Sequence, residues 1–206
     1  DECVASWCEL CTGSECIAAG GQHTCALDSA GQAVCWGNDS YGQSSPPEGT
    51  FTAIAAGFQS TLALTSSGAI VAWGIGDSVS FAPAGMFTAI TAANDDHACA
   101  LTLSGAATCW GWVWTLYEPP SEVSPGNSGV ISISAGGGHV CALDSQGQVL
   151  CWGNDLDGQS SPPEGTFTAI SAGLGHTCAV HADGQVVCWG ASGAGQSTPP
   201  EDFPNP

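Results

Sequence analysis

The feature of this sequence that most restricts its fold is one segment that occurs five times. The first copy runs from Ile17 to Gly37 and reads IAAGGQHTCALDSAGQAVCWG. Successive copies lie 37, 37, 42 and 37 residues apart, measured at the tryptophans Trp36, Trp73, Trp110, Trp152 and Trp189. A fixed period of this length is typical of a repeat architecture, in which each unit buries an apolar face against its neighbours.

Each copy has the pattern of a β-hairpin. If Cys25 lies opposite Cys35, then Asp28 lies opposite Gln32 and a loop of three residues, 29–31, remains between them. The last residue of such a loop adopts the left-handed conformation, which glycine tolerates best. Glycine occupies this position in all five copies, as Gly31, Gly68, Gly105, Gly147 and Gly184. The flanking segments are too short for helices, and a further short strand such as TAIAAG precedes the hairpin.

The same register predicts a disulfide across four of the hairpins. The two cysteines would form a non-hydrogen-bonded pair with Cα atoms about 4.5 Å apart, a distance that a disulfide can span. The predicted pairs are Cys25–Cys35, Cys99–Cys109, Cys141–Cys151 and Cys178–Cys188. The second copy has Leu62 and Ala72 in these places, so both cysteines are missing together, as expected for bonded partners. We expect each disulfide to stabilise the fold by roughly 3 kcal/mol.

Residues 1–16 precede the repeats and hold four further cysteines: Cys3, Cys8, Cys11 and Cys16. These cysteines can form two local disulfides in any of three pairings, or bond to another subunit. A zinc site at the Cys8-x-x-Cys11 spacing is disfavoured, because the other cysteines indicate an oxidising compartment. We therefore expect a secreted, extracellular protein in which Asp1 remains after removal of a signal peptide.

The repeats indicate an all-β fold, a β-propeller of five short disulfide-stapled blades that follows the N-terminal segment. The expected units are about 17–53, 54–89, 90–132, 133–169 and 170–206. The last unit ends where a sixth first strand would begin, so we expect the last blade to pack against the first and close the ring. The alternative is an open stack of the same blades, completed by neighbouring subunits.

The charge of the chain excludes two classes of partner. The sequence has 19 acidic residues and no lysine or arginine, whereas nucleic acids and anionic membrane surfaces are bound through basic residues. No apolar run is long enough to span a bilayer, so membrane insertion is not expected. We expect no cofactor beyond weak calcium binding by the acidic surface; the GNDLDGQ segment resembles a calcium loop, but Gly153 occupies its first ligand position.

Four histidines share one repeat position: His23, His97, His139 and His176. Histidines on several blades could bind a metal, but we expect instead that each imidazole forms a hydrogen bond with the backbone of its own blade. Asn38 begins a possible glycosylation sequon, Asn-Asp-Ser. The repeat accounts for most Ser, His and Asp residues and none lies in a nucleophile elbow, so no catalytic site is predicted.

The residues that break the repeat are the candidate interface. They lie in the second copy and in the linkers after Trp73 and Trp110, and they are Phe58, Ile75, Val79, Phe81, Trp112, Val113, Trp114 and Tyr117. If these linkers reach one face, they form an exposed apolar and aromatic patch of the kind that marks an interface. The alternative is that they fold over and cover a local gap.

The repeated pattern AGxxHTxAL…DGxVxxWGxNxxGQ resembles the regulator of chromosome condensation repeat. The resemblance covers about nine-tenths of the chain and implies a β-propeller. The short period and the GQ-S-x-P-P linkers are similar to the second β-lactamase inhibitor protein, a secreted relative. The resemblance does not fix a function, since the family includes exchange factors, chromatin binders and inhibitors. A chromatin role is contradicted by the absence of lysine and arginine.

These observations favour a secreted, non-enzymatic interaction protein that assembles with itself into an extracellular fibre, coat or matrix. One alternative is a carbohydrate-binding module that stacks sugars on Trp112, Trp114 and Tyr117. Another is a protein inhibitor of a secreted hydrolase, by analogy with the lactamase inhibitor.

Overall fold

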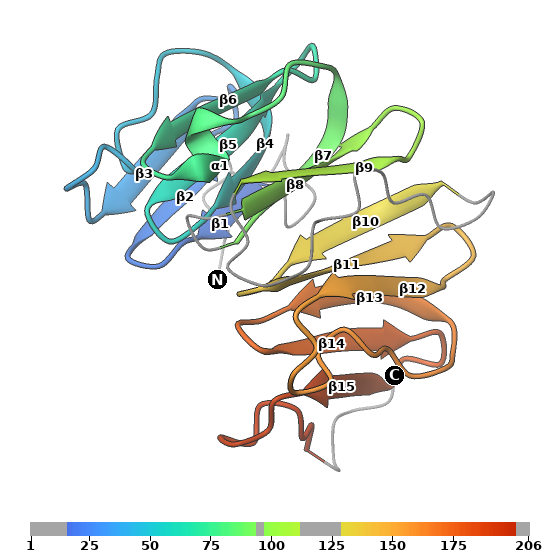
Figure 1. Ribbon diagram of the computed structural model, residues 1–206. Helices are drawn as coiled ribbons and strands as arrows, with labels where there is room; N and C mark the ends of the chain where they lie inside the picture. Colours follow the sequence, from blue (N-terminus) through green and yellow to red (C-terminus); the bar gives the residue numbers. More distant parts are fainter. Residues whose placement is uncertain (1–15, 94–96, 112–128, 201–206) are drawn as a thin grey trace, which may run out of the picture. The chain divides into compact units, whose positions relative to one another are not determined.

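A computed structural model describes residues 16–93, 97–111 and 129–200 of the chain. These residues form five three-stranded antiparallel sheets and one short helix (Figure 1). The predicted all-β class is confirmed, with three strands in every blade. The chain divides into two compact units, Asp1–Leu103 with Trp110–Trp112, and Ser104–Cys109 with Val113–Pro206.

The strands follow the copies of the repeat in order. The first blade consists of β1 (Ile17–Ala19), β2 (His23–Leu27) and β3 (Ala33–Gly37). The second consists of β4 (Phe51–Ala56), β5 (Ser60–Thr65) and β6 (Ile70–Gly74), and helix α1 (Asp77–Ser80) follows it. The third consists of β7 (Phe87–Ala92), β8 (His97–Thr102) and β9 (Ala107–Gly111).

The fourth and fifth blades repeat the same plan. The fourth consists of β10 (Val130–Ala135), β11 (His139–Asp144) and β12 (Val149–Gly153). The fifth consists of β13 (Phe167–Ala172), β14 (His176–His181) and β15 (Val186–Gly190). In each blade the middle strand is hydrogen-bonded to both of the others.

The hairpin turns have the predicted geometry. The amide of Asp28 donates to the carbonyl of Gln32 at 2.9 Å and closes the ladder above a loop of three residues. The five turn glycines have φ between 77° and 89°, in the left-handed region. A second reason for glycine appears in the structure: a Cβ atom on Gly31 would lie 2.9 Å from the Phe51 carbonyl oxygen of the next blade.

The disulfides form across the hairpins as the register predicts. Cys25–Cys35, Cys141–Cys151 and Cys178–Cys188 are bonded, with Cα–Cα distances of 4.1, 4.1 and 4.0 Å. Cys99 and Cys109 are disulfide-bonded as well, which gives four disulfides between strands. Cys16 also forms a disulfide, whereas Cys3, Cys8 and Cys11 lie outside the described residues.

Among the described residues, the buried apolar side chains form clusters that each lie between two consecutive blades. One cluster joins Cys25 and Leu27 of the first blade to Phe51, Ile54 and Trp73 of the second. A second joins the second blade to the third, and a third joins the fourth to the fifth. Each blade therefore depends on its neighbours for burial, as the repeat period predicts.

The start of one blade is fixed to the hairpin turn of the blade before it. The amide of Phe51 donates to the carbonyl of Gly31 at 2.7 Å, and the amide of Phe87 donates to that of Gly68 at 2.8 Å. The same bond joins Phe167 to Gly147 at 2.8 Å. These phenylalanines are also buried. The first residue of each of these blades is therefore held to the preceding blade both by a backbone hydrogen bond to its turn and by packing of the phenylalanine side chain.

Candidate functional site

The predicted interface residues are only partly brought together. Phe58, Ile75 and Phe81 are exposed by 46%, 46% and 62%, and Val79 is half-buried. The amide of Ile75 donates to the carbonyl of Gln59 at 3.0 Å, which places Ile75 beside the loop that carries Phe58. Val79 lies in α1 and Phe81 follows it. Trp112, Val113, Trp114 and Tyr117 lie outside the described residues, as does the sugar-stacking surface they would form.

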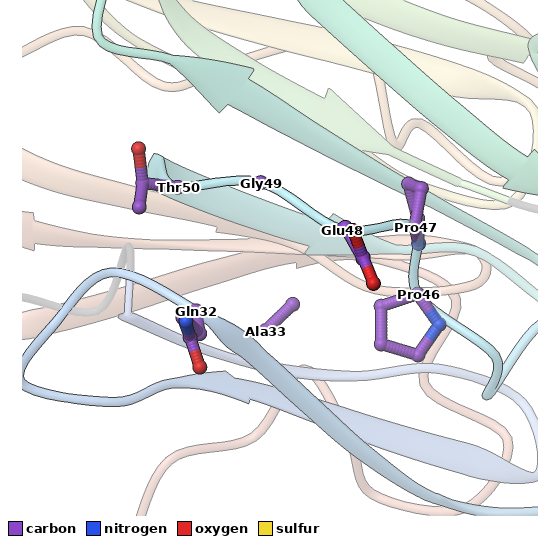
Figure 2. A pocket seen from close by; sticks show the side chains of 7 residues that line it. All are labelled: Gln32, Ala33, Pro46, Pro47, Glu48, Gly49 and Thr50. Atoms are coloured by element: carbon purple, nitrogen blue, oxygen red, sulfur yellow. The ribbon is translucent and has the colours of Figure 1, made fainter.

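A shallow groove lies between the end of the first hairpin and the linker that follows it. It has a volume of about 550 Å³ and is lined by Gln32, Ala33, Pro46, Pro47, Glu48, Gly49 and Thr50 (Figure 2). Glu48 is the one charged residue in this lining. A single carboxylate without a partner acid, base or nucleophile provides no catalytic arrangement here.

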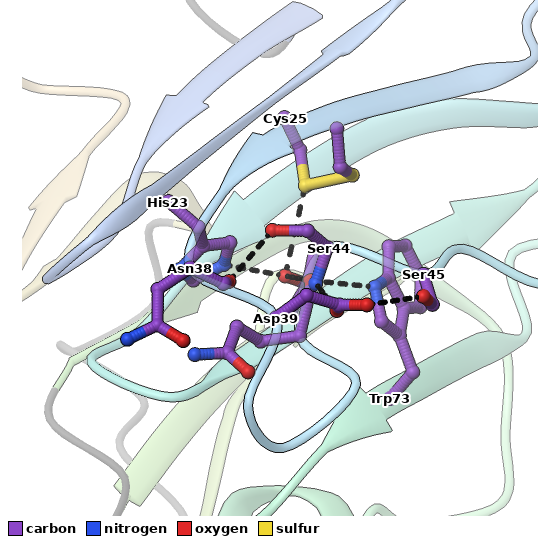
Figure 3. The surroundings of a disulfide bond; sticks show 10 residues. His23, Cys25, Asn38, Asp39, Ser44, Ser45 and Trp73 are labelled. Carbon is purple, nitrogen blue, oxygen red and sulfur yellow. Dashed lines mark hydrogen bonds between the residues drawn. A yellow bond between two sulfur atoms is a disulfide. The ribbon is translucent and has the colours of Figure 1, made fainter.

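A repeated arrangement of polar groups lies instead between blades, where four groups meet; Figure 3 shows two of them, His23 and Trp73, beside the disulfide of Cys25. Nε2 of His23 in the first blade lies 2.7 Å from Oγ1 of Thr61 in the second. The Thr61 hydroxyl is also 3.0 Å from the carbonyl oxygen of Gln43, in the linker between the two blades. The indole N–H of Trp73 donates to the same carbonyl at 3.0 Å. We call this His–Thr–Gln–Trp set the blade contact.

The blade contact recurs between the fourth and fifth blades. Nε2 of His139 lies 2.7 Å from Oγ1 of Thr177, whose hydroxyl is 3.1 Å from the carbonyl oxygen of Gln159. The indole N–H of Trp189 donates to that carbonyl at 2.9 Å. Both threonines are fully buried. The prediction that each histidine bonds to the backbone of its own blade was therefore wrong for His23 and His139, because the imidazole reaches the next blade.

Helix α1 replaces the blade contact between the second and third blades. Ser60 stands at the histidine position and Ala98 at the threonine position. The buried Ser78 of α1 donates its hydroxyl to Ser60 Oγ at 3.1 Å, and its carbonyl accepts the indole N–H of Trp110 at 2.8 Å. Sequence reasoning did not predict this helix. Its role explains why this linker departs from the repeat.

A glycine three residues before His23, His139 and His176 makes room for the imidazole. A Cβ atom on Gly20 would lie 2.4 Å from the His23 ring, and one on Gly136 would lie at the same distance from the His139 ring. Gly173 has the same relation to His176, at 2.3 Å. In these three blades the imidazole thus lies against the backbone of its own blade, and His23 and His139 reach the next blade from there.

Burial lowers the pKa of two of these histidines. Burial is the main cause for His23, opposed by the charge of Asp39 and a hydrogen bond with the Ser60 backbone. Burial lowers the pKa of His97 to about 4. Among the described residues, Nε2 of His97 has no hydrogen-bond partner. The repeat places Val140 at the threonine position of the following copy, where no hydroxyl is available.

We expect acid to destabilise the fold through His97. The folded-state pKa of His97, about 4, lies below its usual value of about 6.5. The stability contributed by its neutral imidazole is therefore fully present above about pH 6.5 and is lost as the pH falls toward 4. The free energy of unfolding should fall by about 2–3 kcal/mol from this group between pH 7 and 4.5. Denaturant unfolding at both pH values should show a smaller fall in the His97→Leu variant. An equal fall, or an NMR titration of His97 near pH 6.5, would contradict the assignment.

The acidic loops after the first and fourth blades use their carboxylates internally. Asp39 accepts hydrogen bonds from the Ser44 amide at 2.8 Å and the Ser45 hydroxyl at 2.7 Å. These bonds, chiefly the one from Ser45, lower the pKa of Asp39. Asp155 accepts the same two bonds from Ser160 and Ser161. The loop that resembles a calcium site thus has the same internal structure as its copy.

The other predicted ligand positions are also located. The side-chain amide of Asn38 donates to Gln22 Oε1 at 2.9 Å, and Asn38 remains a predicted glycosylation site. The described part of the chain contains no group of three or more His, Cys, Asp or Glu side chains placed to hold a metal ion. Within the same residues, no helix has the length and apolar character needed to cross a membrane.

The first blade exposes residues whose counterparts in the second blade are buried. Ile17 is exposed by 58%, whereas Ile54 at the same repeat position is exposed by 4%. Trp36 is exposed by 51%, whereas Trp73 is exposed by 8%. The second blade buries these side chains against the blade that precedes it. The exposed side of the first blade is thus the side on which a preceding blade would pack, and we call it the open face.

Comparison with known sequences identifies the repeat. The sequence model of the regulator of chromosome condensation (RCC1) repeat matches residues 15–43, 51–78, 130–159 and 167–196. No curated protein sequence matches the chain. The matched segments hold four of the five copies found in the sequence, and the copy from Ile90 to Gly111 lies outside them.

Three solved structures show the same fold. The ectodomain of the Physcomitrella patens receptor kinase CR4 is 29% identical, with a TM-score of 0.71 over 84% of this chain and 49% of that one. The ectodomain of the Arabidopsis thaliana receptor kinase ACR4 is 24% identical, with a TM-score of 0.66 over 84% and 62%. Prp20p of Saccharomyces cerevisiae, crystallised in a study of its binding to Gsp1p and histones, is 20% identical, with a TM-score of 0.70 over 84% and 57%.

The chain thus spans about half of the first of these structures and roughly three-fifths of the other two. The four disulfides and the likeness to ectodomains are compatible with an extracellular, non-enzymatic protein.

Proposed function

The chain belongs to the regulator of chromosome condensation (RCC1) repeat family, and from its disulfides and its charge we propose that it is a secreted interaction protein without enzymatic activity. Its proposed activity is self-assembly into an extracellular fibre, coat or matrix. Disulfides across the hairpins support the oxidising compartment. The absence of lysine and arginine argues against nucleic acid as a partner.

The observation that carries the proposal is the open face of the first blade. Ile17 and Trp36 expose 58% and 51% of their surface at positions that the core uses elsewhere. Ile17 and Trp36 lie on the two outer strands of the first sheet, β1 and β3, and tryptophan is enriched in the central part of protein interfaces. Burial of such apolar surface would stabilise an association by about 25 cal/mol per Å² before its entropic costs.

The net charge should control the strength of this association. Each chain has a formal charge of −19 at pH 7, so copies repel one another over distances of about 10 Å at moderate salt. Raising the salt concentration from about 0.05 to about 0.5 M shortens this distance about threefold. We expect association to strengthen with salt, unlike association driven by attraction between opposite charges.

Sedimentation and electron microscopy test the proposal directly. The purified protein, with its disulfides intact, should sediment as species larger than the 20.5 kDa chain at high concentration, and micrographs should show regular assemblies. A protein that stays monomeric at every concentration and salt level would contradict self-assembly. A monomer that captures one hydrolase from its native medium would instead support the inhibitor alternative.

A further inference from the structure

The blade contact has two halves. We call the groups of the earlier blade and its linker the leading half, and the groups of the later blade the following half. The leading blade and its linker provide the imidazole of His23 and the carbonyl of Gln43. The following blade provides the hydroxyl of Thr61 and the indole N–H of Trp73. His139 and Gln159 meet Thr177 and Trp189 in the same way.

The last blade carries a leading half, and among the described residues of its own compact unit no later blade follows it to supply the other half. His176 lies over Gly173 as His23 lies over Gly20. The side chain of Gln196 accepts the amide of Ala194 at 2.8 Å, and the side chain of Gln43 accepts that of Tyr41 at 2.9 Å. The turn is therefore already formed. Gln196 is nevertheless exposed, whereas Gln43 and Gln159 are exposed by only 1% and 3%.

The first blade carries the missing following half. Thr24 stands at the repeat position of Thr61 and Thr177. It is only half-buried, whereas both counterparts are fully buried. Among the described residues, neither the Thr24 hydroxyl nor the indole N–H of Trp36 has a hydrogen-bond partner. Together with Ile17, these two groups make up the open face.

We propose that the open face binds the last blade of a second copy of this chain, in a head-to-tail contact that rests on the self-assembly proposed above. His176 Nε2 of one copy meets Thr24 Oγ1 of the next. The Gln196 carbonyl accepts the Thr24 hydroxyl and the Trp36 indole N–H. The contact has the same chemistry as the two blade contacts inside the chain, and it buries Ile17 as Ile54 is buried.

This arrangement also fixes the type of assembly. The two surfaces differ, so the interface is heterologous and each copy has one surface of each kind free. Successive copies therefore add in one direction, which produces a ring if the rotation closes and a filament if it does not. Partners with a blade of the same pattern fit the open face, whereas a flat or basic protein surface lacks both the imidazole and the carbonyl.

Two variants with one damaged half each test the contact. Trp36→Asp damages the open face and His176→Asp damages the last blade, and each should weaken self-association at least about tenfold, measured by sedimentation equilibrium. An equimolar mixture should form a 1:1 heterodimer through the two intact halves and nothing larger. Leu156→Ser, at an exposed residue of the linker after β12, is the control and should leave association unchanged, whereas Phe81→Ser tests the candidate interface after α1.

The possible failures separate the two proposals. If the wild-type chain does not associate, self-assembly is wrong. If it associates and Phe81→Ser disrupts the assembly while the Asp variants do not, self-assembly stands and the head-to-tail contact is wrong. The contact is also wrong if Trp36→Asp lowers the unfolding midpoint of the dilute monomer by several degrees, because the open face would then be covered within one chain.

Discussion

Complete reduction of the disulfides should unfold this chain at neutral pH. Each hairpin disulfide closes a loop with a sequence separation of 10, and a loop of that length stabilises the folded state by roughly 3 kcal/mol. The four together supply about 12 kcal/mol, which is comparable to the whole stability of a typical domain, about 5–15 kcal/mol. The repulsion among uncompensated carboxylates adds to the loss.

Circular dichroism measures this effect with and without a reductant, with thiol counting to confirm full reduction. The β-sheet signal should disappear at pH 7 in the reduced protein and return on reoxidation. Retention of the signal and of the unfolding midpoint after complete reduction would contradict the predicted contribution of the disulfides.

The second blade offers a design for a milder version of this experiment. The variant Cys141→Leu with Cys151→Ala copies the Leu62 and Ala72 pair, which face each other in the natural second blade. The free energy of unfolding should fall by roughly 3 kcal/mol, and the fold should persist. A change below about 0.5 kcal/mol, the usual size for a surface substitution, would show that this blade does not depend on its disulfide.

Replacing Thr61 with valine should be among the most damaging single changes in the core. Valine has nearly the same shape as threonine but no hydroxyl. At this fully buried site His23 Nε2 would lose its hydrogen-bond partner, and the Gln43 carbonyl would lose one of the two hydrogen bonds that it accepts. An unsatisfied buried polar group costs about 1–3 kcal/mol. We expect a loss of about 3 kcal/mol in total.

Thr24→Val is the matched control, since it is the same substitution at the same repeat position. Thr24 has no hydrogen-bond partner among the described residues, so denaturant unfolding of the dilute protein should change by less than about 0.5 kcal/mol. If Thr61→Val and Thr24→Val lowered the free energy of unfolding equally, the hydrogen bonds between the first two blades would not be the cause of the loss.

Features local to one hairpin could be predicted from the sequence. The turn glycines and the cysteine spacing follow from ladder geometry, which depends on residues close together in the chain. The second copy supplied an internal control, since Leu62 and Ala72 replace both cysteines together. These are the elements that the structure confirms.

Contacts between blades were harder to predict, because their partners lie a whole repeat apart. His23 and Thr61 are separated by 38 residues, and the imidazole could equally well have met its own backbone. Between the second and third copies a signal was present, since Ser60 and Ala98 replace the histidine and the threonine together, but it was incomplete, because His97 is kept where Val140 replaces the threonine of the following copy. Helix α1 has only four residues, too few to give a periodic pattern.

A cryo-electron microscopy or crystal structure of the assembled protein is the most direct test of the head-to-tail contact. It should place the Trp36 indole nitrogen of one copy about 3 Å from the Gln196 carbonyl oxygen of a neighbouring copy. Within the chain, the Trp73 indole nitrogen lies 3.0 Å from the Gln43 carbonyl oxygen in the same way. The His176 imidazole of that neighbouring copy should lie against Thr24. An assembled structure in which Trp36 faces solvent, or in which it meets Gln196 of its own chain, would contradict the account.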